Sequence, residues 1–109
     1  MTTQNPNISL KGKVAFVSGA SKGIGVSIAE LFAAAGCDLA LTARNEQELE
    51  QTAENARKSG VKVWTKTAEM ADADEVKAVG NAALAEFGHI DILVNNAGVT
   101  IPQPILETT

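Results

Sequence analysis

Short apolar runs alternate along the chain with longer segments whose apolar residues recur at helical spacing. The apolar runs predict strands at Val14–Val17, Leu39–Leu41, Val61–Lys66 and Ile90–Val94. The segments between them predict helices that start at Ile24, after Asn45 and after Asp72, and that end at Gly36, Gly60 and Gly88. The chain therefore alternates between strand and helix from the first apolar run to the last.

Apolar spacing and capping patterns identify the individual predicted helices. The apolar residues at helical spacing in the first helix are Ile24, Ile28, Leu31, Phe32 and Ala35. Asn45 and Glu48 have the spacing of a capping box, in which each side chain bonds the backbone N–H of the other residue. Asp72 and Glu75 repeat this spacing before the third helix. Both patterns favour helix starts at these positions.

The order of the elements predicts an α/β fold. Alternating strands and helices form parallel sheets with helices on both faces, so we expect a three-layer, Rossmann-type arrangement. Right-handed crossovers then give the strand order 3-2-1-4. The third run, Val61–Lys66, alternates apolar residues with lysines, and such charge suits the edge position that this order assigns to it.

Composition limits the size of the fold and the kinds of partner. The 109 residues, 45% of them hydrophobic, suffice for one small domain, which we place at residues 10–109 after a polar segment at residues 1–9. A net charge of -4 without a basic run argues against nucleic acid and anionic membranes. One cysteine and one histidine exclude an internal disulfide and a closed zinc site. With no apolar run near ~20 residues and no secretory signal, we expect a cytoplasmic protein.

A glycine-rich segment lies between the first predicted strand and the first predicted helix. It consists of Gly19, Ala20, Ser21, Lys22, Gly23, Ile24 and Gly25. Glycine permits a tight turn and lets phosphate approach the backbone, and a helix N-terminus offers N–H groups and a positive dipole end. The glycine spacing differs from the commoner dinucleotide fingerprint and from the P-loop. We interpret the segment as a pyrophosphate site; the alternative is an ordinary strand-to-helix turn.

The residue that follows the second strand distinguishes two dinucleotides. A carboxylate there would bond the ribose 2′-hydroxyl of NAD, whereas an arginine accommodates the 2′-phosphate of NADP. This chain has Arg44, and Lys22 offers a second positive charge. One charge-assisted contact contributes ~1.5 to 3 kcal/mol, enough for a preference of about tenfold. We therefore expect NADP(H) to be favoured over NAD(H); the alternative is that both side chains are solvated surface groups.

Two motifs in the appropriate order carry a family resemblance. Residues 11–25 read Lys-Gly-Lys-Val-Ala-Phe-Val-Ser-Gly-Ala-Ser-Lys-Gly-Ile-Gly, and residues 95–98 read Asn-Asn-Ala-Gly. Together they resemble the short-chain dehydrogenase/reductase family, and the resemblance extends from about Leu10 to Thr109. Ser18 stands where the family usually has threonine, a change that keeps the hydroxyl.

The resemblance implies further contacts with the cofactor. Glu69 stands where the family usually has an aspartate that faces the adenine, and Met70 follows it. The residues implied to lie beside the adenosine ribose are Asn96, Ala97 and Gly98. Asn95 is implied to brace the sheet. The alternative for Asn95, Asn96, Ala97 and Gly98 is a tight loop that ends a buried strand.

The resemblance also implies hydride transfer between a nicotinamide and a carbonyl or alcohol carbon. Family members use a tyrosine as general acid and base, a lysine four positions later that lowers the pKa of that tyrosine, and a serine that polarises the carbonyl. These residues follow the fourth strand in the family, and this chain contains no tyrosine. We interpret the chain as the truncated NADP(H)-binding half of a reductase, inactive by itself, with no catalytic or metal-binding residue of its own.

Two residues and one strand complete this interpretation. His89 and Cys37 are expected at the end of the sheet away from the crevice, in packing or surface positions. The fourth strand consists largely of apolar residues and would form an edge of the sheet, so we expect self-association through it, and a homo-oligomer for a complete family member. The alternative function is a non-catalytic dinucleotide-binding or interaction module, or a fragment that needs a complementary chain to fold.

Overall fold

A computed structural model of the chain describes residues 9–69 and 71–95. The elements in this part are β1 (Val14–Ser18), α1 (Gly23–Ala34), β2 (Asp38–Ala43), α2 (Glu46–Arg57), β3 (Val63–Thr67), α3 (Ala73–Phe87) and β4 (Ile92–Asn95). The strands are parallel and lie in the order β3-β2-β1-β4. Both the predicted α/β class and the predicted strand order are confirmed.

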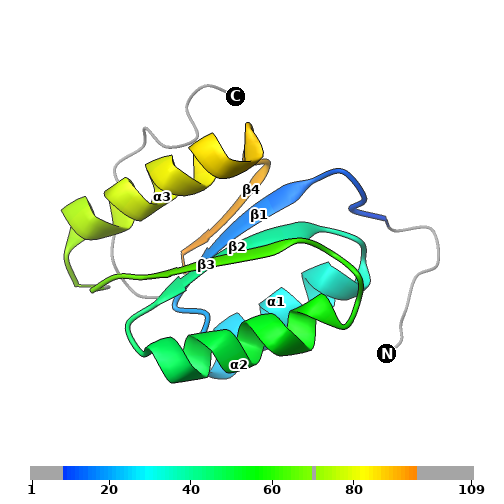
Figure 1. The fold of residues 1–109 in the computed structure, drawn as a ribbon, viewed down its shortest axis with the longest axis horizontal. Coiled ribbons are helices and arrows are strands. Elements are labelled where there is room, and N and C mark those ends of the chain that lie inside the picture. Colours follow the sequence, from blue (N-terminus) through cyan, green and yellow to red (C-terminus); the bar gives the residue numbers. More distant parts are fainter. Residues whose placement is uncertain (1–8, 70, 96–109) are drawn as a thin grey trace.

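The sheet separates two helical layers (Figure 1). Helices α1 and α2 lie on one face and α3 lies on the other. Alternate residues of β1 divide between two cores in the same way: Ala15 and Val17 belong to the core with α1 and α2, and Val14 and Phe16 belong to the core with α3. All four side chains are buried, because both faces of the central strand are covered.

The strand register brings the carboxyl ends of the strands to one edge of the sheet. Ser18 pairs with Thr42 on one side and with Asn95 on the other, and Ala43 pairs with Thr67. The segments that follow these residues therefore emerge next to one another. A parallel sheet places its ligand crevice at this edge.

The capping box predicted at the start of α2 forms only in part. The Asn45 side chain accepts a hydrogen bond from the backbone N–H of Glu48, with 2.9 Å between N and Oδ1. The reciprocal bond is missing: the Oε1 atom of Glu48 is buried without a hydrogen-bond partner. The bond that does form stabilises the start of α2, because the Asn45 side chain satisfies one of the free N–H groups of the first turn.

The start of α3 also departs from the predicted box. The Asp72 carboxylate accepts hydrogen bonds from the backbone N–H groups of Asp74 and Glu75, so the cap is confirmed. The Glu75 carboxylate accepts instead from the backbone N–H of Glu69, at 2.8 Å. That bond joins the helix to the segment after β3. At its other end α3 stops at Gly88, which adopts the left-handed conformation of a C-cap.

The apolar residues of α1 are distributed differently from the predicted face. Its fully buried positions are the small residues Gly25, Ala29 and Ala33, which recur every fourth residue and let the helix approach the sheet closely. Ile24 and Leu31 are 67% and 66% exposed. The predicted helical period is correct, but small residues, rather than the predicted large ones, form the face of α1 that packs against the sheet.

Two strands begin later than the sequence predicts, because aspartate side chains occupy the first ladder positions. The backbone N–H of Lys62 donates to Asp38 Oδ1 at 3.0 Å, and β3 starts at the next residue. The backbone N–H of Val14 donates to Asp91 Oδ2 at 2.9 Å, and β4 starts after Asp91. The carboxylates thus replace backbone carbonyls where the strands enter the sheet.

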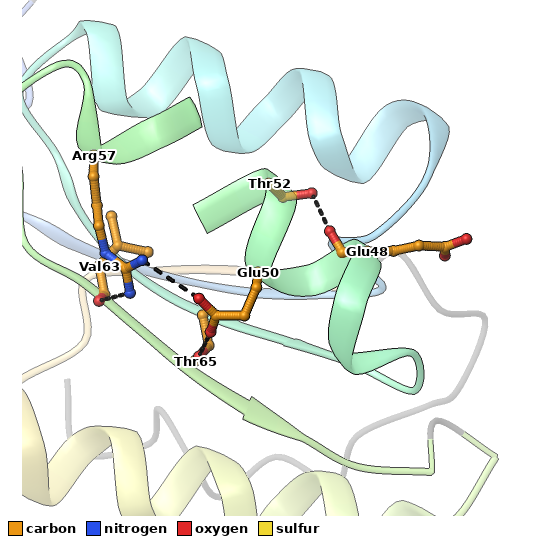
Figure 2. A network of polar contacts seen from close by, with 6 residues as sticks. All are labelled: Glu48, Glu50, Thr52, Arg57, Val63 and Thr65. Atoms are coloured by element: carbon orange, nitrogen blue, oxygen red, sulfur yellow. Dashed lines mark hydrogen bonds and ion pairs between the residues drawn. The ribbon is translucent and has the colours of Figure 1, made fainter. Parts of the chain in front are cut away.

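The free edge of β3 is covered by side chains from α2 (Figure 2). Arg57 donates from Nη2 to the carbonyl of Val63 at 3.1 Å. Glu50 accepts from the Thr65 hydroxyl at 2.7 Å and pairs with Arg57 at 3.4 Å. A sheet edge with free backbone groups invites pairing with another chain, so these contacts and the exposed Lys66 protect it. The edge position predicted for this strand is confirmed.

Candidate functional site

The glycine segment forms the turn from β1 into α1, as predicted. Gly19 and Gly23 have φ angles of 71° and 53°, in the left-handed region that favours glycine. The backbone N–H of Ala20 donates to the Thr42 carbonyl at 3.1 Å, and the side chain of Ala20 is fully buried. The turn is therefore attached to the end of β2. Of the predicted site residues here, Ala20 and Gly25 lie in the interior, whereas Lys22, Gly23 and Ile24 are exposed and Ser21 is half-buried.

The N-terminus of α1 differs from those of the other two helices. No side chain caps it, and its first turn contains no acidic residue. Asn45 and Asp72 cap α2 and α3, and each of those helices has two acidic residues in its first turn. The backbone N–H of Gly25 donates to the Lys22 carbonyl, and the N–H groups of Gly23 and Ile24, with the positive dipole end, are left for an anion. A Cβ atom added at Gly23 would meet nothing within 4 Å, so the surface beside these groups is open.

Arg44 lies at the same edge of the sheet, immediately after β2. Its side chain is 77% exposed, and Nη1 lies 3.7 Å from Oε2 of Glu69. The contact follows from the sheet register, because Ala43 pairs with Thr67 and the backbone N–H of Ala68 donates to the Ala43 carbonyl. From the sequence, Arg44 and Glu69 are expected to face different parts of a cofactor, so their pairing is a finding of the structure. The predicted strand order, which makes the second and third strands neighbours, was the signal that could have revealed it.

Ser18 and Asn95 join the carboxyl ends of β1 and β4. The Ser18 hydroxyl lies 3.2 Å from Oδ1 of Asn95 and 3.3 Å from the carbonyl of Val94. Ser18 is fully buried, so this hydroxyl needs a protein partner. The predicted bracing role of Asn95 agrees with this contact. The remaining predicted site residues, Met70, Asn96, Ala97 and Gly98, lie outside the described residues.

His89 and Cys37 lie at the opposite edge of the sheet, as expected. His89 Nε2 is 3.2 Å from both the Gly12 carbonyl and Asp91 Oδ2. Cys37 is fully buried, and desolvation, with the nearby Asp38 charge as a second cause, raises the pKa of its thiol to about 11. A thiol held neutral in this way is a poor nucleophile. Within residues 9–69 and 71–95 no cluster of side chains could hold a metal ion.

A hollow lies beside the free edge of β3. It has a volume of about 370 Å³ and is lined by Glu46, Leu49, Glu50, Trp64, Thr65, Lys66 and Thr67. Its central carboxylate, Glu50, is engaged through both oxygens by Arg57 and Thr65. The arrangement stabilises the edge of the sheet. The Glu50 carboxylate is thus fully engaged within the protein, in contrast to the uncapped end of α1.

The described part contains no helix long and apolar enough to cross a membrane. One edge of the sheet differs from the rest of the described structure. It carries the glycine turn, the uncapped start of α1 and Arg44. Their donors suit a phosphorylated ligand, since backbone N–H groups, a lysine and an arginine converge on the carboxyl ends of β1 and β2.

Comparison with known proteins identifies the family of the chain. A family model described as short chain dehydrogenase matches residues 13–109. An uncharacterized oxidoreductase of Mycobacterium tuberculosis is 37% identical over 100 residues, which are 92% of this chain and 38% of that relative. The chain therefore spans well under half the length of this relative.

Solved structures give the same result. A Serratia marcescens short-chain dehydrogenase/reductase, solved as a double mutant, superposes with a TM-score of 0.77 at 42% identity, over 84% of this chain and 38% of that one. Carveol dehydrogenase from Mycobacterium avium, solved in complex with NAD, superposes with a TM-score of 0.76 at 28% identity, over 83% of this chain and 37% of that one. Sequence motifs, strand order and these matches agree, and the chain belongs to the short-chain dehydrogenase/reductase family.

Proposed function

We propose that this chain forms the dinucleotide-binding part of an oxidoreductase that transfers hydride between NADP(H) and a carbonyl or alcohol substrate. The observation that carries the proposal is the contrast between α1 and the other helices. Only α1, among the described helices, begins without a side-chain cap or an acid, and it does so at the glycine turn. A helix start of this kind binds phosphate.

The residues of the turn have distinct parts in this proposal. Gly23 leaves the backbone approachable, because its Cβ position opens to solvent. Lys22 lies exposed at the N-cap position and supplies positive charge to the pyrophosphate. Ala20 holds the turn against β2 through its bond to Thr42. When bound, the nicotinamide would supply or accept the hydride.

A preference for NADP(H) over NAD(H) rests on Arg44. An arginine after the second strand is the group that accommodates a 2′-phosphate in this type of fold. Arg44 occupies that position and is largely exposed, so its guanidinium is accessible to a ligand. The NAD complex of the Mycobacterium avium relative shows that a member of this structural group binds the other dinucleotide, so the preference needs a direct test.

We also propose that this chain by itself does not transfer hydride. The family's general acid is a tyrosine, and the 109 residues contain none. His89 and Cys37 lie at the opposite edge of the sheet from the glycine turn and offer no replacement. NADPH oxidation in the presence of a carbonyl compound should therefore stay at the background rate. A turnover above background that Lys22→Ala abolishes would contradict this part of the proposal.

Titration with NADPH and NADH tests the binding proposal, with quenching of Trp64, the single tryptophan, as the readout. We expect saturable binding of both and tighter binding of NADPH. Arg44→Asp should lower the ratio of NADPH to NADH affinity about tenfold or more, because one charge-assisted contact is lost and a repulsion is added. Lys11→Asp, at the opposite edge, makes the same change of charge and should leave the ratio unaltered. An unchanged ratio in Arg44→Asp would remove Arg44 from the phosphate site.

A further inference from the structure

The ion pair between Arg44 and Glu69 lies where the two dinucleotides differ. Arg44 is the residue placed to meet a 2′-phosphate, and Oε2 of Glu69 is 3.7 Å from its Nη1 atom. The Arg44 guanidinium therefore has an anionic partner within the chain. Any phosphate that approaches Arg44 meets this carboxylate as well.

Glu69 is the more firmly held member of the pair. Its Oε2 atom accepts from the backbone N–H of Ala71 at 3.4 Å, and its own backbone N–H donates to Glu75 Oε1 at 2.8 Å. Its carbonyl accepts from the backbone N–H of Asp72 at 3.0 Å. The Glu69 side chain is 43% exposed and that of Arg44 is 77% exposed. The Glu69 backbone is thus fixed at the start of α3 and its carboxylate has one further N–H donor, whereas the Arg44 side chain is the more exposed partner.

The charges around the ion pair make the region beside Arg44 unfavourable for a phosphate. Glu69, Asp72 and Glu75 are joined by hydrogen bonds at the start of α3, and Arg44 is the cation paired with this group in the described residues. A phosphate monoester carries about -1.5 to -2 charges at pH 7. The phosphate therefore competes with Glu69 for the Arg44 guanidinium, and the Glu69 carboxylate repels it. A ribose 2′-hydroxyl, which is neutral, meets neither penalty.

We propose that Glu69 is a specificity-determining residue that limits the preference for NADP(H) by competing with the 2′-phosphate for Arg44. This inference rests on the proposed function. In it, Arg44 creates the preference and Glu69 reduces its size, so that NAD(H) also remains a usable ligand. The effect acts on the dinucleotide equilibrium and requires no contact between Glu69 and the reacting atoms.

The test is a set of dissociation constants for NADP+ and NAD+, measured by calorimetry at low salt on the whole chain. The proteins are the wild type, Glu69→Gln, Arg44→Gln and the double variant. Glu69→Gln keeps the shape of the side chain and removes its charge. Glu86→Gln is the matched control: Glu86 forms a comparable exposed pair with Lys62, at 3.0 Å, on the opposite edge of the sheet, and loses the same charge.

We expect Glu69→Gln to raise the affinity for NADP+ about two- to fivefold, the range that exposed ion pairs give, and to leave the affinity for NAD+ nearly unchanged. The gain should largely disappear when Arg44 is also replaced, and it should shrink at high salt. Glu86→Gln should reproduce neither effect. This pattern would establish Glu69 as a residue that acts through Arg44.

Other results would overturn the inference, each in a recognisable way. Binding of both dinucleotides with an unaltered ratio in Glu69→Gln would remove Glu69 from specificity and leave the proposed function intact. A lower NADP+ affinity in that variant would show that Glu69 orients Arg44 for the phosphate instead. An equal gain in the Arg44→Gln background would show that the pair is not the cause. Absence of binding to every protein would reject the proposed function together with the inference.

Discussion

The backbone N–H of Ala20 donates to the carbonyl of Thr42 with 3.1 Å between nitrogen and oxygen. This bond extends the pairing of β1 with β2 beyond their last paired residues, Ser18 and Thr42. It fixes the glycine turn to the strand that carries Arg44. The backbone of the glycine turn, proposed to meet the pyrophosphate, is therefore held beside the backbone that carries Arg44, proposed to meet the 2′-phosphate.

The first prediction concerns Gly23, which combines a φ of 53° with an open Cβ position. Gly23→Ala should cost about 1 to 2 kcal/mol of stability, because a Cβ atom is strained in the left-handed region. The added methyl group should also block phosphate from the backbone and weaken dinucleotide binding. Urea unfolding and NADPH titration measure the two effects.

Gly60 provides the matched control for Gly23. It has a φ of 89°, it too would place a Cβ atom in open space, and it lies after α2 at the edge away from the glycine turn. Gly60→Ala should lose comparable stability and keep wild-type affinity. If both variants lost the same affinity, strain rather than obstruction would explain the result for Gly23.

The second prediction concerns the missing cap of α1. Lys22 stands at the N-cap position in an extended conformation, with φ of -144° and ψ of 151°, as an N-cap residue normally does. Lys22→Asp should therefore cap the helix and raise stability by about 0.5 to 1 kcal/mol, with a contribution from the helix dipole. The same carboxylate should repel pyrophosphate and weaken binding strongly. Stability and affinity thus move in opposite directions.

Lys22→Ala separates charge from capping. It removes the lysine without offering a capping oxygen, so we expect weaker binding than in the wild type and no gain in unfolding free energy. Thermal unfolding and NADPH titration of Lys22→Asp and Lys22→Ala distinguish the effect of the lysine charge from that of the cap. A loss of stability in Lys22→Asp would show that the start of α1 is not open to a capping side chain.

The third prediction concerns the link between β1 and β4. Ser18→Ala removes the hydroxyl that contacts Asn95 and the carbonyl of Val94 and should cost about 1 kcal/mol, the usual net value of one hydrogen bond. Ser59→Ala, at an exposed position after α2, should change stability by less than about 0.5 kcal/mol. Urea midpoints at constant m-value provide the comparison. Equal midpoints for Ser18→Ala and wild type would show that the link contributes nothing.

The fold was predictable because its determinants are local or periodic. Apolar runs and glycine stops specify the elements, and the handedness of crossovers leaves one order for the strands. The same reasoning placed the lysine-bearing strand at the edge, where β3 is found. Each level of the sequence points to one arrangement, so a single chain sufficed to derive it.

The failures share one physical cause: packing, rather than local spacing, decides which groups a side chain meets. Glu75 has the spacing of a capping-box residue, yet its carboxylate bonds the N–H of Glu69, which only the path of β3 brings near. Leu31 has the period of a core residue, yet the helix approaches the sheet through its small residues. The pair of Arg44 with Glu69 likewise requires the register of two strands. Local patterns specify elements, whereas side-chain partners depend on packing.

The last prediction follows from Cys37, whose thiol is buried where β2 begins. Burial raises the pKa of this thiol from 9.0 to about 11. Between these values the unfolded chain releases the proton and the folded chain retains it, so the unfolded state binds fewer protons and the free energy of unfolding falls as pH rises. The slope of this contribution reaches roughly 1 kcal/mol per pH unit near pH 10 and becomes small only about one unit below pH 9. Unfolding curves of wild type and Cys37→Ala from pH 8 to 11 isolate it, because the other titrating groups are common to both proteins. The stability difference between the two should shrink steadily above pH 9, and a constant difference across that range would mean that the thiol ionises equally easily in both states.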